Sequence, residues 1–530
     1  MKTGCFLLAL AAAISCAFAS PAEETAAGWY ADGQALIAER RLARGEPAPA
    51  RNVILFVGDG MSFATVAAAR ILEGQKRGES GESNLLYFEQ FPHTAFSKTY
   101  NTDRQTPDSA GTMTAMVTGV KTFAGGLSVD QQARPGDCES AQGRELVTLL
   151  DIASLAGLAT GVVTNTRITH ATPAALYART PHRRWESDAG MPEQARQAGC
   201  RDIARQLVEY DIGGGIDVVL GGGRREFLPE DGQDPEYPEL AGHRKDGRDL
   251  IGEWQERHPE GRYVWNLDQF REAVEQAELP LLGLFEPSHM QYEHDRGDDA
   301  AGEPSLTEMT RESIALLSDR GDEGYFLMVE GGRIDHGHHG NNAYRALTET
   351  IEFARAIEAA HKMTDPQETL IVVTADHGHA MVFAGYPARG NPITGLVRRP
   401  DDDGKPGELQ LDRDGRPMTT LRYFDGPGYR EDGRPDYVGV DPNDPDFRQE
   451  APIGLRSATH SGEDVPVYAT GPGAEVLHGV FEQNVIFHAM LQARPDLADL
   501  AEQLAGDEGL PAWQKVQTGP GSEADFAGDD

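Results

Sequence analysis

The fold of this 530-residue chain is constrained most by the segment Tyr325-Phe-Leu-Met-Val-Glu330-Gly-Gly-Arg-Ile-Asp335-His-Gly-His-His339. Its first five residues form an apolar run typical of a buried strand, and two glycines then break the pattern. Two carboxylates and three imidazoles are not buried together unless a cation or a catalytic role holds them. If the segment after the glycines is helical, Asp335 and His339 share one face, as a chelating pair requires. The alternative is a polar loop with solvated histidines.

Polar groups also follow other apolar runs. Residues 52–57 and 369–374 are near-continuous apolar strands, which is typical of the centre of a sheet covered on both faces. The first ends at Asp59 and the second at Asp376 and His377, and open α/β sheets bind ligands at the carboxyl ends of their strands. The alternation of strands and helices predicts an α/β fold, a three-layer sandwich whose large, mostly parallel central sheet is flanked by helices.

Helices are predicted from Ser62 to about Gly74, from Gly143 to Ala156 and from Ala343 to His361. A further short helix is predicted after Ser109. A serine at the positive end of a helix suits an alkoxide or a bound phosphate, although a simple capping role is commoner. We expect residues 231–304 to be irregular. Residues 386–457 lose the strand–helix alternation, which predicts an inserted surface subdomain.

The first 19 residues have the features of a signal peptide. Lys2 provides a positive start, a short apolar stretch follows, and Ala17-Phe18-Ala19 fits a cleavage signal. The protein is therefore expected to be exported to the periplasm or the extracellular medium. Two of the four cysteines lie in this peptide, which leaves Cys138 and Cys200. In an oxidising compartment these most simply form one disulfide; a pair of buried free thiols is the alternative.

The charge balance restricts the partners of this protein. Its 85 acidic residues against 48 basic ones give a net charge of −37, which argues against binding nucleic acid or anionic lipid. The sequence contains no second hydrophobic span, so no membrane-spanning segment is expected. Residues 501–530 form an acidic tail without the hydrophobic end that a lipid-anchor signal needs.

The acidic and imidazole groups define a chemistry. Aspartate and histidine without cysteine suit catalytic zinc, and carboxylate and hydroxyl groups suit magnesium. Paired metal ions can clamp the attacking and the leaving oxygen of a phosphoryl transfer. A serine beside such a pair can be ionised by coordination, without a histidine base. The residue types therefore predict a phosphotransfer enzyme. The groups collected are Asp59, Glu330, Asp335, His339, Asp376, His377 and His460.

Six motifs in this order resemble the alkaline phosphatase family, from about residue 51 to residue 491. The resemblance is closer to the animal type than to the enterobacterial type. The motifs are Val57-Gly-Asp59-Gly-Met, Pro107-Asp-Ser109, Thr169-His170-Ala-Thr172-Pro, Glu330-Gly-Gly-Arg-Ile-Asp335-His-Gly-His-His339, Thr374-Ala-Asp376-His377 and His460-Ser-Gly-Glu-Asp.

The resemblance implies an exported, homodimeric phosphomonoesterase that works at alkaline pH through a phosphorylated Ser109, with Arg183 clamping the phosphate. Trp185 fixes the register of Arg183 against its neighbour Arg184. Two zinc ions and one magnesium are implied. The implied ligands are Asp335, His339 and His460 for the first zinc, Asp376 and His377 for the second, and Asp59, Thr172 and Glu330 for magnesium, with Asp59 bridging.

The resemblance also implies a domain organisation. Residues 20–50 correspond to an N-terminal arm that contacts the second subunit. Residues 51–385 and 458–500 form the catalytic domain, and residues 386–457 form the inserted crown-like subdomain. The rival functions are those of phosphodiesterases, sulfatases and metal-dependent mutases. A metal- or phosphate-binding protein without turnover is the rival from another class.

Two further expectations follow from the animal-type resemblance. His170 and His336 stand where the enterobacterial branch has Asp and Lys, which predicts magnesium-responsive activity with a strongly alkaline optimum. A calcium ion is implied with Glu236, Glu286 and the carbonyl of Phe285 as ligands. Glu303 is the fourth ligand; it replaces the family's Asp after a two-residue insertion, and calcium's flexible geometry tolerates the change. A solvated acidic loop is the alternative.

Overall fold

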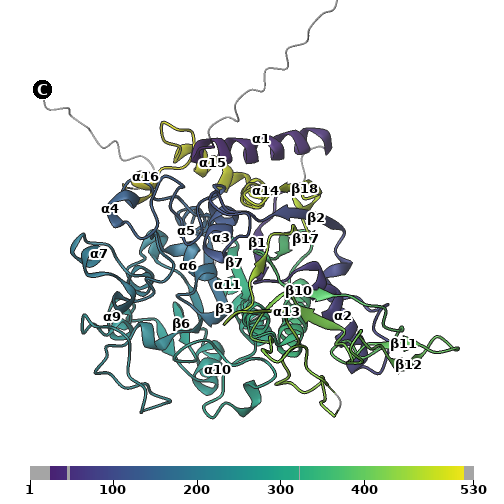
Figure 1. Ribbon diagram of the computed structural model, residues 1–530. Coiled ribbons are helices and arrows are strands. Elements are labelled where there is room, and N and C mark those ends of the chain that lie inside the picture. The colour runs from purple at the N-terminus through teal and green to yellow at the C-terminus, as the bar shows by residue number, and fades with distance from the viewer. Residues whose placement is uncertain (1–23, 45–47, 321–322, 438, 519–530) are drawn as a thin grey trace, which may run out of the picture.

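The centre of the molecule is a ten-stranded sheet in the order β18-β2-β17-β8-β1-β7-β3-β4-β6-β5 (Figure 1). The computed structural model describes residues 24–44, 48–320, 323–437 and 439–518. Neighbouring strands run parallel except where β17 pairs with β2 and with β8. The strands are β1 (Asn52–Gly58), β2 (His93–Lys98), β3 (Ala159–Arg167), β4 (Val218–Gly222), β5 (Arg262–Val264), β6 (Leu281–Leu284), β7 (Tyr325–Gly331), β8 (Thr369–Thr374), β17 (Val465–Thr470) and β18 (Gly479–Glu482).

Helices cover both faces of this sheet. Successive side chains of a strand point to opposite faces, so Leu55 and Ile54 belong to different hydrophobic clusters. One face packs against α3 (Ser109–Thr118), α5 (Leu149–Leu155), α6 (Ala171–Tyr177) and α14 (Val485–Ala493). The other packs against α2 (Phe63–Lys76), α11 (Leu306–Arg320) and α13 (Ala343–Met363). The predicted three-layer sandwich is confirmed.

The other helices are shorter or lie at the periphery. They are α1 (Ala26–Arg44), α4 (Cys138–Ala141), α7 (Glu193–Gln197), α8 (Ile203–Val208), α9 (Leu250–Arg257), α10 (Leu267–Glu275), α12 (Arg333–His339), α15 (Pro495–Gln503) and α16 (Trp513–Thr518). Short 3-10 turns are η1 (Tyr87–Gln90), η2 (Asp188–Gly190), η3 (Ile212–Gly214), η4 (Arg224–Glu226), η5 (Arg296–Asp298) and η6 (Ala474–Val476).

The predicted start of a helix was right where its N-cap residue was recognised in the sequence and wrong where the N-cap was overlooked. Ser62 caps α2 by accepting a hydrogen bond from the backbone N–H of Thr65, as expected. The helix predicted from Gly143 begins only at Leu149, because Thr148 and Asp151 form a capping box that starts it there.

Residues 231–304 are not irregular throughout. They contain α9, β5, α10 and β6, and the two strands form one edge of the central sheet. These strands are only three and four residues long, and the neighbouring helices α9 and α10 are short and interrupted by charged residues. The sequence therefore contains no long apolar run that would predict them.

The expected N-terminal arm contains α1, which lies across the end of the molecule and packs beside α14 (Figure 1). Its Trp29, Tyr30 and Ile37 are buried, and the carbonyl of Trp29 accepts a hydrogen bond from Asn484. Residues 501–518 of the expected tail are also folded, since the guanidinium of Arg179 lies 4.0 Å from the centre of the Trp513 ring.

The segment 386–457 consists of loops and small sheets, with no helix among its described residues. Figure 1 shows the hairpin of β11 and β12 extending away from the central sheet. The other short strands, some of which flank this segment, are β9 (Gly378–His379), β10 (Met381–Phe383), β11 (Arg398–Pro400), β12 (Pro406–Leu409), β13 (Leu421–Tyr423), β14 (Asp425–Gly426), β15 (Ile453–Gly454) and β16 (His460–Ser461).

The predicted disulfide is present. Cys138 and Cys200 are bonded, with their Cα atoms 6.0 Å apart. The predicted signal peptide, residues 1–19, lies outside the described residues. In the part of the chain that is described, no helix combines the length and the apolar character needed to cross a bilayer.

Candidate metal centre

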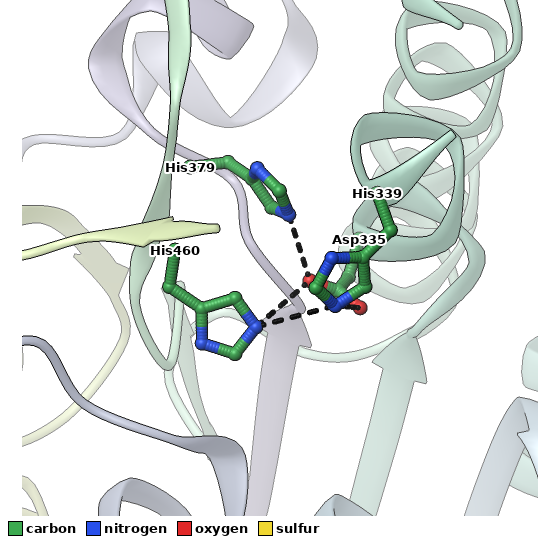
Figure 2. A group of neighbouring side chains, drawn as sticks. All are labelled: Asp335, His339, His379 and His460. Carbon is green, nitrogen blue, oxygen red and sulfur yellow. Dashed lines mark hydrogen bonds and ion pairs between the residues drawn. The ribbon is translucent and has the colours of Figure 1, made fainter. Parts of the chain in front are cut away.

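The group around Asp335 lies beyond the carboxyl end of β7. Helix α12 presents Asp335 and His339 on one face, with His339 Nε2 3.2 Å from Asp335 Oδ2. Figure 2 shows the rings of His379 and His460 converging on the same carboxylate, with Nε2 atoms 3.3 and 3.5 Å from Asp335 Oδ1. These ligand atoms all lie within 4.8 Å of one another, the arrangement of a metal site. The predicted helix after the two glycines, with Asp335 and His339 on one face, is confirmed.

Backbone carbonyls aim the imidazoles at this group. His339 Nδ1 donates to the carbonyl of Ala458 at 2.6 Å, and His460 Nδ1 donates to that of Pro107 at 2.9 Å. Each Nε2 lone pair then points inward, and the two Nε2 atoms face each other at 3.3 Å. Such outer hydrogen bonds fix the orientation of metal-binding histidines.

The neighbouring carboxylates lie at the ends of the central strands. Asp59, Glu330 and Asp376 are buried without exposure, beyond β1, at the end of β7 and beyond β8. Burial together with Asp376, Asp335 and Glu330 raises the pKa of Asp59 well above its usual value. Burial raises the pKa of Glu330 to about 7, against hydrogen bonds from Thr164, Thr172 and Thr166. Buried carboxylates so close to one another require a cation if they are ionised.

Asp335 behaves differently from these carboxylates. Burial acts to raise its pKa, but the imidazoles of His339, His379 and His460 bring it well below the usual value. Burial also lowers the pKa of His377 to about 4, of His460 to about 4 and of His379 to about 3. These imidazoles are therefore neutral above pH 6, the state that binds a metal ion.

Ser109 is the first residue of α3, and its hydroxyl lies at the edge of the same group. Asp108 caps the helix through Gly111 N–H, which leaves Ser109 at the positive helix end. Ser109 Oγ is 3.2 Å from His377 Nε2, which is itself 3.4 Å from Asp59 Oδ1 and 3.2 Å from Asp376 Oδ2.

Arg183 and Ser109 line one cavity of about 360 Å³. The Asp108 carboxylate accepts a hydrogen bond from Arg183 Nη1 at 2.9 Å, and His170 Nε2 lies 3.2 Å from Arg183 Nη2. The guanidinium is therefore held from two sides. A planar, bidentate donor beside a serine hydroxyl suits the oxygens of a phosphoryl group.

His170 and His336 are adjacent, with ring centroids 5.5 Å apart. His289 was not predicted, and its ring lies 4.1 Å from that of His336. Burial lowers the pKa of all three imidazoles well below the usual value. His170 also has a ligand atom within 4.8 Å of those of Asp59 and Glu330, so it borders the expected magnesium position directly.

The acidic group expected to hold calcium is assembled differently from the prediction. Glu236 and Glu286 come together with Asp299, a residue that was not predicted, with ligand atoms within 4.8 Å of one another. Glu303 lies outside this trio, although Glu286 and Asp299 help to raise its pKa to about 9 after the larger effect of burial. Asp299 directly follows η5, in the loop between Glu286 and Glu303.

The inserted segment 386–457 contacts the metal centre. Asp425 accepts hydrogen bonds from both the N–H and the hydroxyl of Thr459, each at 2.8 Å, and Thr459 precedes His460. Tyr423 OH is 2.8 Å from Nδ1 of the buried His338 in α12. Segment 386–457 thus contacts the chain neighbours of two candidate ligands: Thr459 is next to His460, and His338 is next to His339.

In the group around Asp335, the sequence analysis missed His379. It lies two residues beyond the motif Thr374-Ala-Asp376-His377, and the sequence pattern gave it no role. Strand alternation supplied a signal, because residues two apart point to the same side of an extended chain. The pairing of His379 with His460 between β9 and β16 is a tertiary contact that no local pattern shows.

The sequence profile of the family described as alkaline phosphatase matches residues 50–495. The chain belongs to the alkaline phosphatase family. It is 46% identical over 452 residues to the tissue-nonspecific alkaline phosphatase of Gallus gallus, covering 84% of each chain. It is also 46% identical over 451 residues to an alkaline phosphatase of Gadus morhua, covering 84% of this chain and 91% of the relative. The protein is therefore a hydrolase of this family.

Solved structures agree on the fold. The alkaline phosphatase of Thermus thermophilus aligns with a TM-score of 0.59 at 24% identity, over 87% of this chain and 98% of that one. That of the Antarctic bacterium TAB5 gives a TM-score of 0.57 at 22% identity, over 85% and 99%. At these identities the likeness concerns the fold alone.

Proposed function

We propose that this protein hydrolyses phosphate monoesters at alkaline pH through a phosphoserine intermediate on Ser109. The observation that carries the proposal is the position of Ser109 Oγ, at a helix N-terminus and 3.2 Å from His377 Nε2. The same cavity contains Arg183. Family membership implies phosphomonoester hydrolysis, and the roles of the individual residues are our inference.

The donor set fits two zinc ions and one magnesium ion. Asp335, His339 and His460 would hold the first zinc, with His379 orienting Asp335; Asp376 and His377 would hold the second. Asp59 and Glu330 lie close enough together to offer carboxylate oxygens to magnesium. Thr172 would add its buried hydroxyl, and Asp59 also lies beside His377. When bound, these ions supply positive charge for the attacking and leaving oxygens.

The chain's own groups position the reaction. Ser109 attacks phosphorus and forms the phosphoserine bond as the ester P–O bond breaks. Arg183 donates to two non-bridging oxygens, and Asp108 holds the guanidinium in place. The N-terminus of α3 favours negative charge at the attacking oxygen. Hydrolysis of the phosphoserine then releases inorganic phosphate and restores Ser109.

The alternatives on this fold fit the site less well. A sulfatase needs a Cys/Ser-x-Pro-x-Arg nucleophile motif, whereas Ser109 is followed by Ala-Gly-Thr-Met. A phosphodiesterase must accommodate a second ester group, and a clamp such as Arg183 on two non-bridging oxygens favours monoesters. A binding protein without turnover does not need a serine at this position.

Replacing Ser109 with alanine tests the proposal. We expect Ser109→Ala to bind zinc like the parent but to hydrolyse p-nitrophenyl phosphate at least about 10³-fold more slowly, as nucleophile loss does elsewhere. A phosphoserine adduct should be found by mass spectrometry of acid-quenched parent and not of the variant. Parental activity in Ser109→Ala would show the mechanism to be wrong, and faster turnover of bis-p-nitrophenyl phosphate would favour a diesterase.

His170 and His336 support the alkaline optimum and a response to magnesium. Both are neutral where the enterobacterial branch has charged groups, so the magnesium position has less negative charge and phosphate is held less tightly. A His170→Asp/His336→Lys double variant should bind magnesium more tightly and turn over more slowly. Unchanged values for both would leave the two imidazoles as packing groups only.

Three further properties are proposed: a calcium site, export from the cytoplasm and a homodimeric assembly. We propose that Glu236, Glu286 and Asp299, with the Phe285 carbonyl and Glu303 close by, hold a structural calcium ion. We also propose export to an oxidising compartment, which the disulfide supports. The expected assembly is a homodimer in which residues 20–50 contact the second subunit, and sedimentation of the purified protein tests it.

A further inference from the structure

The cavity at Ser109 has a polar lining well beyond the groups that contact a phosphoryl group. Its lining includes Arg167, Arg184, Glu186 and His289. Among the described residues that line it, none has an aliphatic or aromatic hydrocarbon side chain. A phosphoryl group held by Ser109 and Arg183 leaves the ester substituent to occupy the remaining space. That space favours a polar substituent over an apolar one.

Most charges in this part of the cavity are already paired. Glu186 accepts two hydrogen bonds from Arg167, at 2.7 Å each, and a third from the hydroxyl of Thr169 at 2.7 Å. Arg167 also contacts His289 Nε2. Asp108 is likewise occupied by Arg183 and by the backbone of Gly125. These groups have little capacity left for a ligand.

Arg184 is the exception. It is exposed at the rim of the cavity, and within the described ranges no ion pair joins its guanidinium to a carboxylate. Its backbone belongs to a fixed turn, because Trp185 N–H donates to the carbonyl of His182 and the Trp185 side chain is buried. An unpaired cation on a fixed turn is notable in a chain with a net charge of −37.

We propose that Arg184 forms an anion subsite for the leaving group. It gives the enzyme a preference for phosphomonoesters whose leaving group has a second negative charge, such as a carboxylate. This inference rests on the proposed phosphomonoesterase function. The ester substituent extends from the bound phosphoryl group towards the rim of the cavity. There the Arg184 guanidinium can pair with the oxygens of a carboxylate or phosphate on the substituent. The effect is that of a partly exposed ion pair, so it is modest and depends on salt.

Two matched esters test the subsite, 4-carboxyphenyl phosphate and phenyl phosphate. The measured quantity is the ratio of their kcat/KM values for the holoenzyme. We expect Arg184→Gln to lower this ratio about three- to fivefold, the range of an exposed ion pair. Raising the salt from about 0.05 to about 0.5 M should shrink the parental ratio towards that of the variant. Arg184→Lys should retain part of the preference.

Arg104→Gln is the matched control. Arg104 is exposed on the segment that leads to Asp108 but does not line the cavity, and its loss changes the net charge equally. The ratio of kcat/KM for 4-carboxyphenyl phosphate to that for phenyl phosphate should be the same in Arg104→Gln as in the parent. The subsite is overturned if Arg184→Gln keeps the parental ratio, or if Arg104→Gln lowers it as much. If the parent hydrolyses neither ester, the proposed function itself fails, which is a separate outcome.

Discussion

The imidazole-rich group at Asp335 and the acidic group at Glu286 are both candidate metal sites, but they are preorganised to different degrees. Around Asp335, backbone carbonyls orient His339 and His460. Burial lowers the pKa of His379 and of His460, and both imidazoles face the Asp335 carboxylate, whose pKa is also depressed. Around Glu286, burial and then neighbouring carboxylates raise the pKa of Glu286 to about 7 and of Glu303 to about 9.

The two candidate sites therefore differ in how much an ion would have to change the protonation and order of their side chains. The candidate ligands Asp335 and His460 already have the protonation state that zinc binds, because the pKa of each lies below its usual value. Backbone hydrogen bonds already orient His339 and His460. The acidic group must lose protons before a cation binds, and Glu303 Oε2 and both oxygens of Asp299 are buried without a hydrogen-bond partner among the described residues. Calcium would therefore contribute to local order there, whereas the first site is ordered by the fold.

Removing the carboxylate at the centre of the ordered site should have the largest effect. We expect Asp335→Ala to lose one zinc ion per chain and to lower kcat/KM for p-nitrophenyl phosphate by at least about 10³-fold, because three imidazoles then lack their shared anion. Metal analysis by mass spectrometry together with initial rates tests this. Full zinc content in the variant would show that Asp335 is not a ligand.

Loosening the support of that site should have an intermediate effect. Asp425→Ala removes two hydrogen bonds to Thr459 and should raise the zinc dissociation rate about 10- to 100-fold, as loss of outer contacts does at metal sites. Transfer of zinc to a coloured chelator measures the rate. Asp412→Ala is the control, since Asp412 pairs with Arg434 in the same inserted segment and makes no contact to Thr459. If Asp425→Ala and Asp412→Ala release zinc at equal rates, the effect comes from general disturbance of segment 386–457, and the two hydrogen bonds to Thr459 have no specific role.

Breaking the acidic group should alter stability and leave the chemistry in place. In zinc- and magnesium-loaded protein, millimolar calcium should raise Tm by a few degrees, corresponding to about 1–3 kcal/mol of ligand-linked stability. Asp299→Asn and Glu286→Gln should each abolish most of this shift without lowering kcat. Calcium that leaves Tm unchanged in the parent would indicate that the group is only a solvated acidic loop.

The change of the calcium-induced Tm shift with pH should be the smallest of these effects. Without calcium, the pKa of Glu303 is raised on folding from its usual 4.5 to about 9. Its contribution to stability is therefore complete below about pH 4.5 and is lost as the pH rises through about 9. Calcium binds the ionised carboxylates, so the calcium-induced rise in Tm should grow over the same range. Thermal melts at several pH values, with and without calcium, measure this; a shift that is constant with pH would contradict it.

Much of the candidate metal site could be predicted because its residues stand at positions that short sequence patterns define. Asp335 and His339 are four residues apart on one helix, and Asp59, Glu330 and Asp376 each come at or just beyond the end of an apolar strand. In a parallel sheet such ends meet at one edge, so local pattern and sheet geometry together predict the cluster. Helix starts followed their caps, and the error at residue 143 came from overlooking Thr148.

The sequence by itself determined the central strands β1, β7 and β8, the shared helix face of Asp335 and His339, the place of Ser109 at a helix start and the disulfide partners. Each of these depends on short-range periodicity or on a small number of candidates. Only the tertiary structure decided that His379 pairs with His460, that Asp299 joins Glu236 and Glu286, and that Asp425 supports Thr459. These contacts join segments up to 81 residues apart, His379 and His460. No periodicity in either segment encodes such a contact, since it depends on how loops of particular length return to the edge of the sheet.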